Sequence, residues 1–324
     1  MLLILSEKAV TDSVWPLLVK TGYTSLLGFF MLSAVGTCFI AWISERQALA
    51  GQKTLVDKFA WHMAQACRIL VLSTLPCIVG GSLLLLGLRG FRSFLFFVPP
   101  LLVLLAVLFL LALGLVMAYV GTWNPMRERG FGHVVLGAFA SLVGLVTLLL
   151  FILFLWAFLL QPEVVVTGSS LYAFFVSLPP FCAFSPLYVF LVQLTAMVPA
   201  VAAEVGLVYL LFVRDRDDFG RDYYQSALHL GGLWGFWGQV TQLAGLLWFG
   251  VVLYFDSAWA TLTSLPFLLL VGGLFLGLLG LIALGLVIHS DNALRQKPVV
   301  MAGAVCQALG IVMQGFSLEL LFFS

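Results

Sequence analysis

Long apolar runs recur along this chain and constrain its fold more than any other feature. A helix of about 20 apolar residues crosses the hydrocarbon core of a bilayer, so such runs are typical of spanning helices. Hydrophobic residues make up 63% of the 324 residues and charged residues 9%, too little charge to cover a water-soluble fold of this size. We therefore expect an all-α polytopic membrane protein.

The apolar runs predict eight transmembrane helices. They cover residues 14–44, 60–88, 93–120, 131–160, 171–213, 224–254, 260–289 and 299–323. The fifth range is longer than one bilayer requires, and its first part contains Pro179, Pro180 and Pro186. Since proline interrupts a helix, we interpret that part as a bent or interfacial segment and not as a ninth span.

Lysines and arginines are divided unevenly between the two sides of the predicted helices. The odd-numbered connections carry ten: Arg46, Lys53, Lys58, Arg127, Arg129, Arg214, Arg216, Arg221, Arg295 and Lys297. The termini and even-numbered connections carry four: Lys8, Lys20, Arg89 and Arg92. Because cytoplasmic loops are enriched in these residues, we expect the odd connections in the cytoplasm and both termini outside. The expected location is the bacterial cytoplasmic (inner) membrane.

The second half of the sequence follows the pattern of the first. The stretch 33–46 is an apolar helix that ends in charge, and the stretch 202–218 repeats this pattern. We therefore predict two tandem four-helix units, at residues 1–163 and 164–324. Each unit has an even number of spans, so the copies are expected to be parallel, unlike the inverted repeats of many transporters.

The four histidines are expected toward the cytoplasmic side. His62 and His133 lie in the first turns of spans two and four, His229 lies about two turns into span six, and His289 ends span seven. Imidazole on a helix is the usual axial ligand of b-type haem. Since His229 is expected to be the best shielded, we treat His229, His62 and His133 as candidate contacts for haem b or quinone. The alternative makes them interfacial groups that bond headgroups, water or helix ends.

Two charges are predicted inside the membrane. Arg68 lies ten residues after Lys58, and Glu204 lies ten residues before Arg214, so both are expected about 15 Å from the cytoplasmic surface. Intramembrane charges are costly and are usually paired or functional. One interpretation is an Arg68–Glu204 ion pair, or separate polar contacts, joining the two units. The other makes Glu204 a proton-accepting carboxylate near a quinone and Arg68 a partner of a haem propionate.

Amide side chains also lie within the predicted spans. Gln239 and Gln242 stand among the tryptophans and glycines of span six, and Gln307 and Gln314 lie in span eight. Glutamines hydrogen-bond between helices, and tryptophans with amides could also cradle a quinone ring. Both interpretations stay open for span six. For span eight we expect packing contacts.

Several classes of function are not indicated. The net charge of +1 gives no basic field for nucleic acid. The five cysteines form no CxxC or CxxCH motif, so neither a zinc site nor covalent c-type haem is encoded, and no metal site is predicted. We expect these cysteines to be small buried hydrophobes: Cys38, Cys67, Cys77, Cys182 and Cys306. No nucleotide-binding glycine loop or catalytic triad candidate is present.

Three stretches resemble subunit I of the cytochrome bd-type quinol oxidases. Residues 44–59 look like that family's connection between its first two helices, 121–133 like its third turn and the start of its fourth helix, and 185–221 like its fifth helix and following turn. The resemblance covers most of residues 14–240. It implies a helical membrane subunit of a respiratory electron-transfer chain that interacts with quinone.

The chain departs from this family at the expected haem ligands. Where the family's first helix carries a haem-ligating histidine, this chain has Gly22-Tyr-Thr-Ser, and where the fifth carries another it has Val192-Gln-Leu-Thr. Phe96 to Val120 contains none of the family's carboxylates, and the long quinol-recognising outer loop is missing. We therefore expect a scaffold without the oxygen-reducing site.

A second resemblance is to the haem-free eight-span quinone subunits of the NrfD/DmsC type. Those proteins also pair two four-helix units and have an outer N-terminus, and the Trp15-Pro16 start is similar. Their outer His-Leu-Gly motif has no counterpart in Leu86-Gly-Leu-Arg89.

Three functional hypotheses follow. The first is a membrane subunit of a respiratory complex, in contact with quinone or anchoring redox partners such as a cytochrome c. The second is a small-molecule transporter or permease, which would need a water-filled central cavity. The third is a purely structural scaffold for other subunits. Whether the chain is itself an enzyme is left open.

Overall fold

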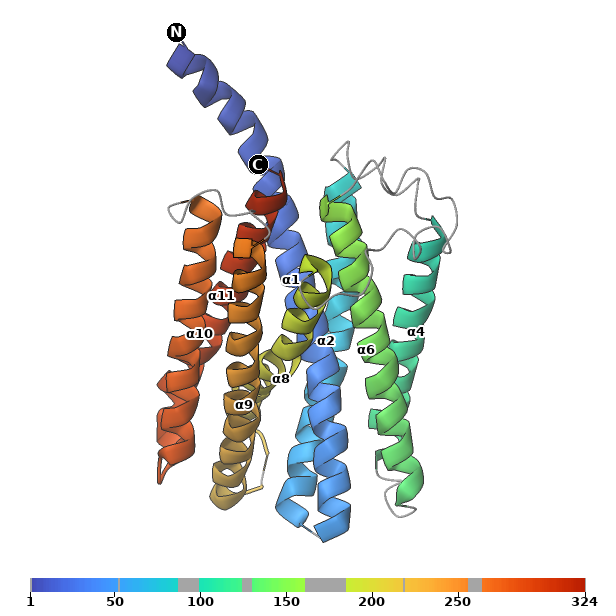
Figure 1. Ribbon diagram of the computed structural model, residues 1–324. Coiled ribbons are helices and arrows are strands. Elements are labelled where there is room, and N and C mark those ends of the chain that lie inside the picture. Colours follow the sequence, from blue (N-terminus) through green and yellow to red (C-terminus); the bar gives the residue numbers. More distant parts are fainter. Residues whose placement is uncertain are drawn as a thin grey trace.

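The computed structural model describes residues 2–51, 53–86, 99–123, 130–160, 185–217, 219–255 and 264–323. These ranges form eight α-helices and one short 3-10 helix (Figure 1). The elements are α1 (Leu2–Gly51), α2 (Thr54–Leu86), α4 (Pro99–Gly121), α6 (Phe131–Leu160), α8 (Pro186–Val213), α9 (Arg221–Phe255), α10 (Leu265–His289), η2 (Ala293–Gln296) and α11 (Lys297–Phe323). All eight α-helices are long and apolar enough to cross a membrane. The predicted all-α polytopic class is confirmed, and the chain is an integral membrane protein.

The first and fifth helices differ most from the predicted spans. Helix α1 begins at Leu2, although its membrane-spanning part begins at Thr21. Helix α8 begins at Pro186, at the first helical position, where the missing N–H of proline would have no helical partner in any case. Of the segment that we interpreted as bent or interfacial, residues 171–184 lie outside the described part of the chain.

Helices α1, α4, α8 and α10 end, and helices α2, α6, α9 and α11 begin, at one end of the bundle, whereas α1 begins and α11 ends at the other (Figure 1). We call these the charged end and the terminal end. Gly130 and Gly220 precede α6 and α9 with φ of 67° and 81°, in the left-handed region that glycine adopts without strain. Which end faces the cytoplasm stays a prediction.

Helix pairing follows the same order in both halves of the chain. In the first half, α1 packs on α2 and α4 on α6, and in the second half α8 packs on α9 and α10 on α11. Helices α1 and α8 join the halves. At their crossing, a methyl group on Gly36 would lie 2.4 Å from both Ala202 Cβ and Val198 O, so a residue without a side chain is required. The tandem repeat itself stays a prediction.

The interior of the first half combines small apolar side chains with large ones such as Phe59, Met63 and Tyr119. A cavity of ≈40 Å³ there is lined by residues such as Ala34, Cys38 and Val71. Of the cysteines expected inside, Cys38 and Cys67 are buried, Cys77 and Cys306 are half-buried, and Cys182 lies outside the described residues. The outward faces are also apolar, as expected for helices in contact with lipid.

Candidate functional site: a cavity and a line of buried polar side chains

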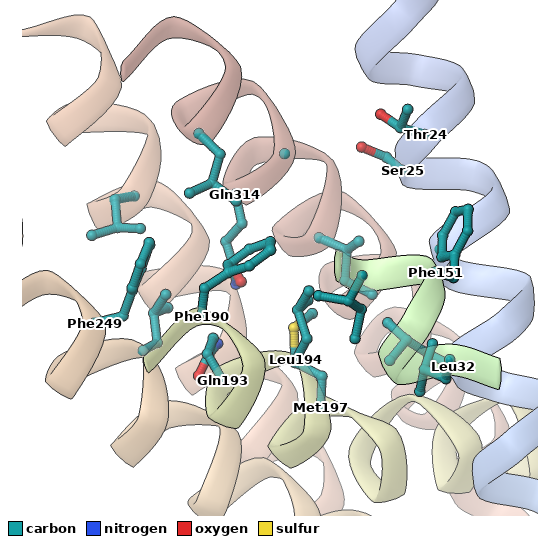
Figure 2. Close-up of a pocket in the computed structure, with 18 residues that line it drawn as sticks. Thr24, Ser25, Leu32, Phe151, Phe190, Gln193, Leu194, Met197, Phe249 and Gln314 are labelled. Carbon is teal, nitrogen blue, oxygen red and sulfur yellow. The ribbon is translucent and has the colours of Figure 1, made fainter. Parts of the chain in front are cut away.

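A cavity of ≈100 Å³ lies between the two halves, toward the terminal end. Helices α1, α6, α8, α9, α10 and α11 all line it, mostly with apolar side chains. Three phenylalanines border it: Phe151, Phe190 and Phe249 (Figure 2). Its polar lining residues are Thr24, Ser25, Gln193 and Gln314 (Figure 2). We call this space the glutamine cavity.

Gln193 has the least satisfied side chain in the cavity wall. It is 2% exposed, and neither Oε1 nor Nε2 has a hydrogen-bond partner in the described part of the chain. An unpaired polar group in an apolar interior costs about 1–3 kcal/mol. The amide is also held close to α9, because a methyl group on Gly245 would lie 2.4 Å from its Oε1. A donor and an acceptor are thus presented to whatever fills the cavity.

Helical periodicity explains why these residues converge. On α8, Phe190, Gln193, Leu194 and Met197 follow the i, i+3, i+4, i+7 spacing that places side chains on one face. On α11 the same spacing joins Ile311, Gln314, Gly315 and Leu318. The small residues let the backbones approach, since a methyl group on Gly315 would lie 2.4 Å from Ser25 Oγ of α1.

A line of buried polar side chains runs from the cavity toward the charged end through the second half. Gln307 Nε2 of α11 donates to Gln242 Oε1 of α9 at 2.6 Å, and Gln239 Nε2 donates to the Gly277 carbonyl of α10 at 3.1 Å. Gln239 Oε1 has no partner among the described residues. We call the following set the polar line: Gln193, Gln314, Gln307, Gln242, Gln239 and Glu204.

Glu204 lies at the end of the polar line that is nearer the charged end of the bundle. Its side chain is 3% exposed, and neither carboxyl oxygen has a hydrogen-bond partner in the part of the chain that the structure describes. Its Oε1 would lie 3.4 Å from a methyl group on Gly280, and Gln239 Nε2 would lie 3.9 Å from the same point. The Arg68–Glu204 ion pair that equal depth suggested is therefore not formed. Depth along two helices does not determine which face each side chain occupies.

His62 is fully buried near the charged end and joins the two halves. Its Nε2 donates to Asp217 Oδ2 at 2.9 Å, and its Nδ1 lies 2.5 Å from the Tyr223 hydroxyl. The ring stacks on Tyr223, with centroids 5.4 Å apart, and Phe219 meets it edge-on. Both nitrogens have protein partners, so this ring links α2 to the turn between α8 and α9.

His133 is the centre of a second buried network, within the first half. Its Nε2 donates to the Tyr119 carbonyl at 2.9 Å, and its Nδ1 lies 2.5 Å from Glu45 Oε1. The Tyr119 hydroxyl donates to the other Glu45 oxygen at 2.8 Å. We call Glu45, Tyr119 and His133 the Glu45 triad. It ties α1, α4 and α6 together with every polar side-chain group satisfied.

His229 does not occupy the shielded position that we expected. It is exposed on α9, in a polar groove at the charged end that Asp222 and Ser290 also line. His289 is exposed as well, and its Nδ1 donates to the Gly285 carbonyl at 2.9 Å. With His62 and His133 engaged at both nitrogens, the described histidines do not fit a buried bis-histidine haem site.

The cavity residues were missed as a site by the sequence reasoning, although one signal pointed at them. Thr24, Ser25 and Gln193 lie within the two stretches, 22–25 and 192–195, where the resemblance to the bd-type family led us to look for histidines. We interpreted both stretches only as lost ligands. In the structure they meet at one cavity, α1 supplying the hydroxyls and α8 the amide.

No match was found when the chain was compared with protein-family models, with curated proteins and with solved structures.

Proposed function

We propose that this protein is an integral membrane subunit of a respiratory electron-transfer complex, and that it binds the ring of a membrane quinone in the glutamine cavity. The observation that carries the proposal is the unpaired amide of Gln193 in an aromatic, apolar cavity within the membrane. Such cavities with a few placed polar groups are typical of small-molecule sites.

The chemistry of the cavity wall matches that of a quinone ring. A quinone is a flat apolar ring with two carbonyl oxygens that accept hydrogen bonds. Gln193 Nε2 is a free donor, and the Ser25 hydroxyl and the Gln314 amide lie in the same wall. Phe190 and Phe249 supply aromatic surface for the ring (Figure 2). These residues would hold and orient the ring and exclude water from it.

The resemblance to the bd-type oxidases supports the same site. On that resemblance, the two stretches that replace haem-ligating histidines both line the glutamine cavity. A scaffold that has lost its haem ligands would keep a space there for a smaller ring. The electrons then have to come from, or pass to, other subunits, such as the cytochrome c that is among the partners expected from the sequence.

The test is quinone binding by the purified protein in lipid nanodiscs. Gln193→Leu removes the free donor, so we expect affinity for a short-chain quinone to fall roughly tenfold, the equivalent of ~1.4 kcal/mol. Thr195→Val is the matched control, because Thr195 is on the same helix but bonds to the Leu191 carbonyl and does not line the cavity.

Gly245→Ala provides a second variant that acts through Gln193. The new methyl group would displace the end of the Gln193 side chain, so binding should weaken without any loss of a polar group. The proposal fails if wild-type protein binds no quinone, or if Thr195→Val loses as much affinity as Gln193→Leu.

A proton-coupled transporter is the second candidate, and the unpaired carboxyl of Glu204 favours it. It predicts proton flux into vesicles in the absence of quinone, abolished in Glu204→Gln. The quinone-binding account predicts no such flux.

A further inference from the structure

The surroundings of Glu204 favour the neutral acid form of its carboxyl group. An ionised carboxylate in an apolar interior requires a cation or several donors, and its burial without them costs many kcal/mol. Glu204 is 3% exposed and has no hydrogen-bond partner in the described ranges. Of the two protonation states, the acid is therefore the one that this environment accommodates.

The packing around the Glu204 carboxyl group leaves room for a bound proton but not for a hydrated ion. Its Oε1 would be in van der Waals contact, at 3.4 Å, with a methyl group on Gly280. The carbonyl of Gly303 on α11 would lie 3.9 Å from the same point. Helices α8, α10 and α11 thus close around the carboxyl group. A proton needs no additional room there.

The polar line connects this carboxyl group with the glutamine cavity. Gln239 and Glu204 face the same point beside Gly280, and Gln242 follows Gln239 by one helical turn. Gln242 bonds to Gln307, and Gln314 lies two turns further along α11, in the cavity wall. Glu204 and Gln193 are eleven residues apart on α8, or about 16 Å along the helix.

Helix α10 makes room for the polar line because glycines face it. Gly273, Gly277 and Gly280 recur at helical spacing and are all buried. A methyl group on Gly277 would lie 3.0 Å from Gln239 Nε2, and one on Gly273 would lie 3.0 Å from Gln314 Cγ. The polar groups therefore occupy the space that side chains of α10 would otherwise fill.

We propose that Glu204 is the proton-exchanging group of the glutamine cavity and that the polar line is the route between them. This inference rests on the proposed quinone site. Reduction of a quinone takes two electrons, from a haem- or iron–sulfur-bearing partner subunit, and two protons. For each proton, the Glu204 O–H bond breaks and an O–H bond forms on a ring oxygen. The carboxylate left behind takes up a proton from the charged end, and quinol oxidation runs the same steps in reverse.

The test uses infrared difference spectra of the purified protein with bound quinone, reduced electrochemically through mediators so that no partner subunit is needed. We expect a protonated-carboxyl band that changes on reduction and shifts in D₂O. Glu204→Gln should remove the band, and Glu204→Asp should retain a shifted one. Asp222→Asn, an exposed carboxylate on α9, is the control and should leave it unchanged.

Proton-uptake kinetics give the second readout. In Glu204→Gln we expect the rate of proton uptake on quinone reduction to fall about 10²-fold, the usual scale for losing a positioned proton donor, while quinone affinity is unchanged. A full rate and an unaltered carboxyl band in Glu204→Gln, with quinone bound, would overturn this inference but leave the quinone site intact. Absence of quinone binding in the wild type would overturn both.

Discussion

Two glutamates of this protein are equally buried but differ in their hydrogen bonding. Glu45 and Glu204 are each 3% exposed. Both oxygens of Glu45 are engaged, by His133 and by the Tyr119 hydroxyl, whereas neither oxygen of Glu204 has a partner among the described residues. Burial alone therefore does not identify a functional carboxyl group. A satisfied network fixes helices to one another, and an unsatisfied group is available for chemistry.

The same contrast extends to the two cavities. The first half encloses a cavity of ≈40 Å³ lined by apolar residues and two threonines. The cavity of ≈100 Å³ between the two halves is lined by Gln193 and Gln314, and the polar line leads away from it. We interpret the Glu45 triad as structural, and the cavity between the halves together with the polar line of the second half as the site.

The largest expected effect is on stability, in the Glu45 triad. Glu45→Leu leaves the buried His133 Nδ1 without its partner, so we expect a loss of about 3–5 kcal/mol of unfolding free energy. Glu204→Gln breaks no pair and should change stability by less than about 1 kcal/mol. Unfolding in detergent micelles measures both. Equal effects of the two substitutions would remove the distinction between the two glutamates.

The pair of Gln242 and Gln307 provides an intermediate effect. Gln242→Leu leaves Gln307 Nε2 buried without an acceptor and should cost about 1–3 kcal/mol, whereas the double variant with Gln307→Leu should recover much of that loss. In both variants the polar line is interrupted, so proton uptake should stay slow even where stability returns. If proton uptake recovers in the double variant, the line is not the route.

The smallest expected effect is at His229. Because this side chain is exposed, His229→Ala should change stability by less than about 0.5 kcal/mol. Quinone affinity should also be unchanged, since His229 does not line the glutamine cavity. A marked loss of quinone affinity in this variant would mean that the quinone binds near His229 and not in the glutamine cavity.

Much of the fold could be predicted from the sequence because the bilayer imposes it. Apolar runs long enough to span determine the eight described helices. Glu204 was recognised as a special residue for the same reason, since a carboxylate within an apolar run is rare.

What could not be predicted is which helix faces meet. His229 was expected to be the shielded histidine from its distance along the helix, but the rotation of α9 turns it outward. Arg68 and Glu204 have similar depth and still do not pair. Gln193 is a candidate site residue because it packs against Gly245 of α9 and shares a cavity with Ser25 of α1. No local pattern in α8 encodes those neighbours.

The most direct test of the account is photo-crosslinking with an azido-quinone in nanodiscs, followed by mapping of the labelled peptides. The account predicts label on the cavity-lining segments of α8 and α11, around Phe190 to Met197 and Ile311 to Leu318, displaced by excess unlabelled quinone. Label confined to the lipid-facing surfaces of α4 and α10, or not displaced by quinone, would contradict it.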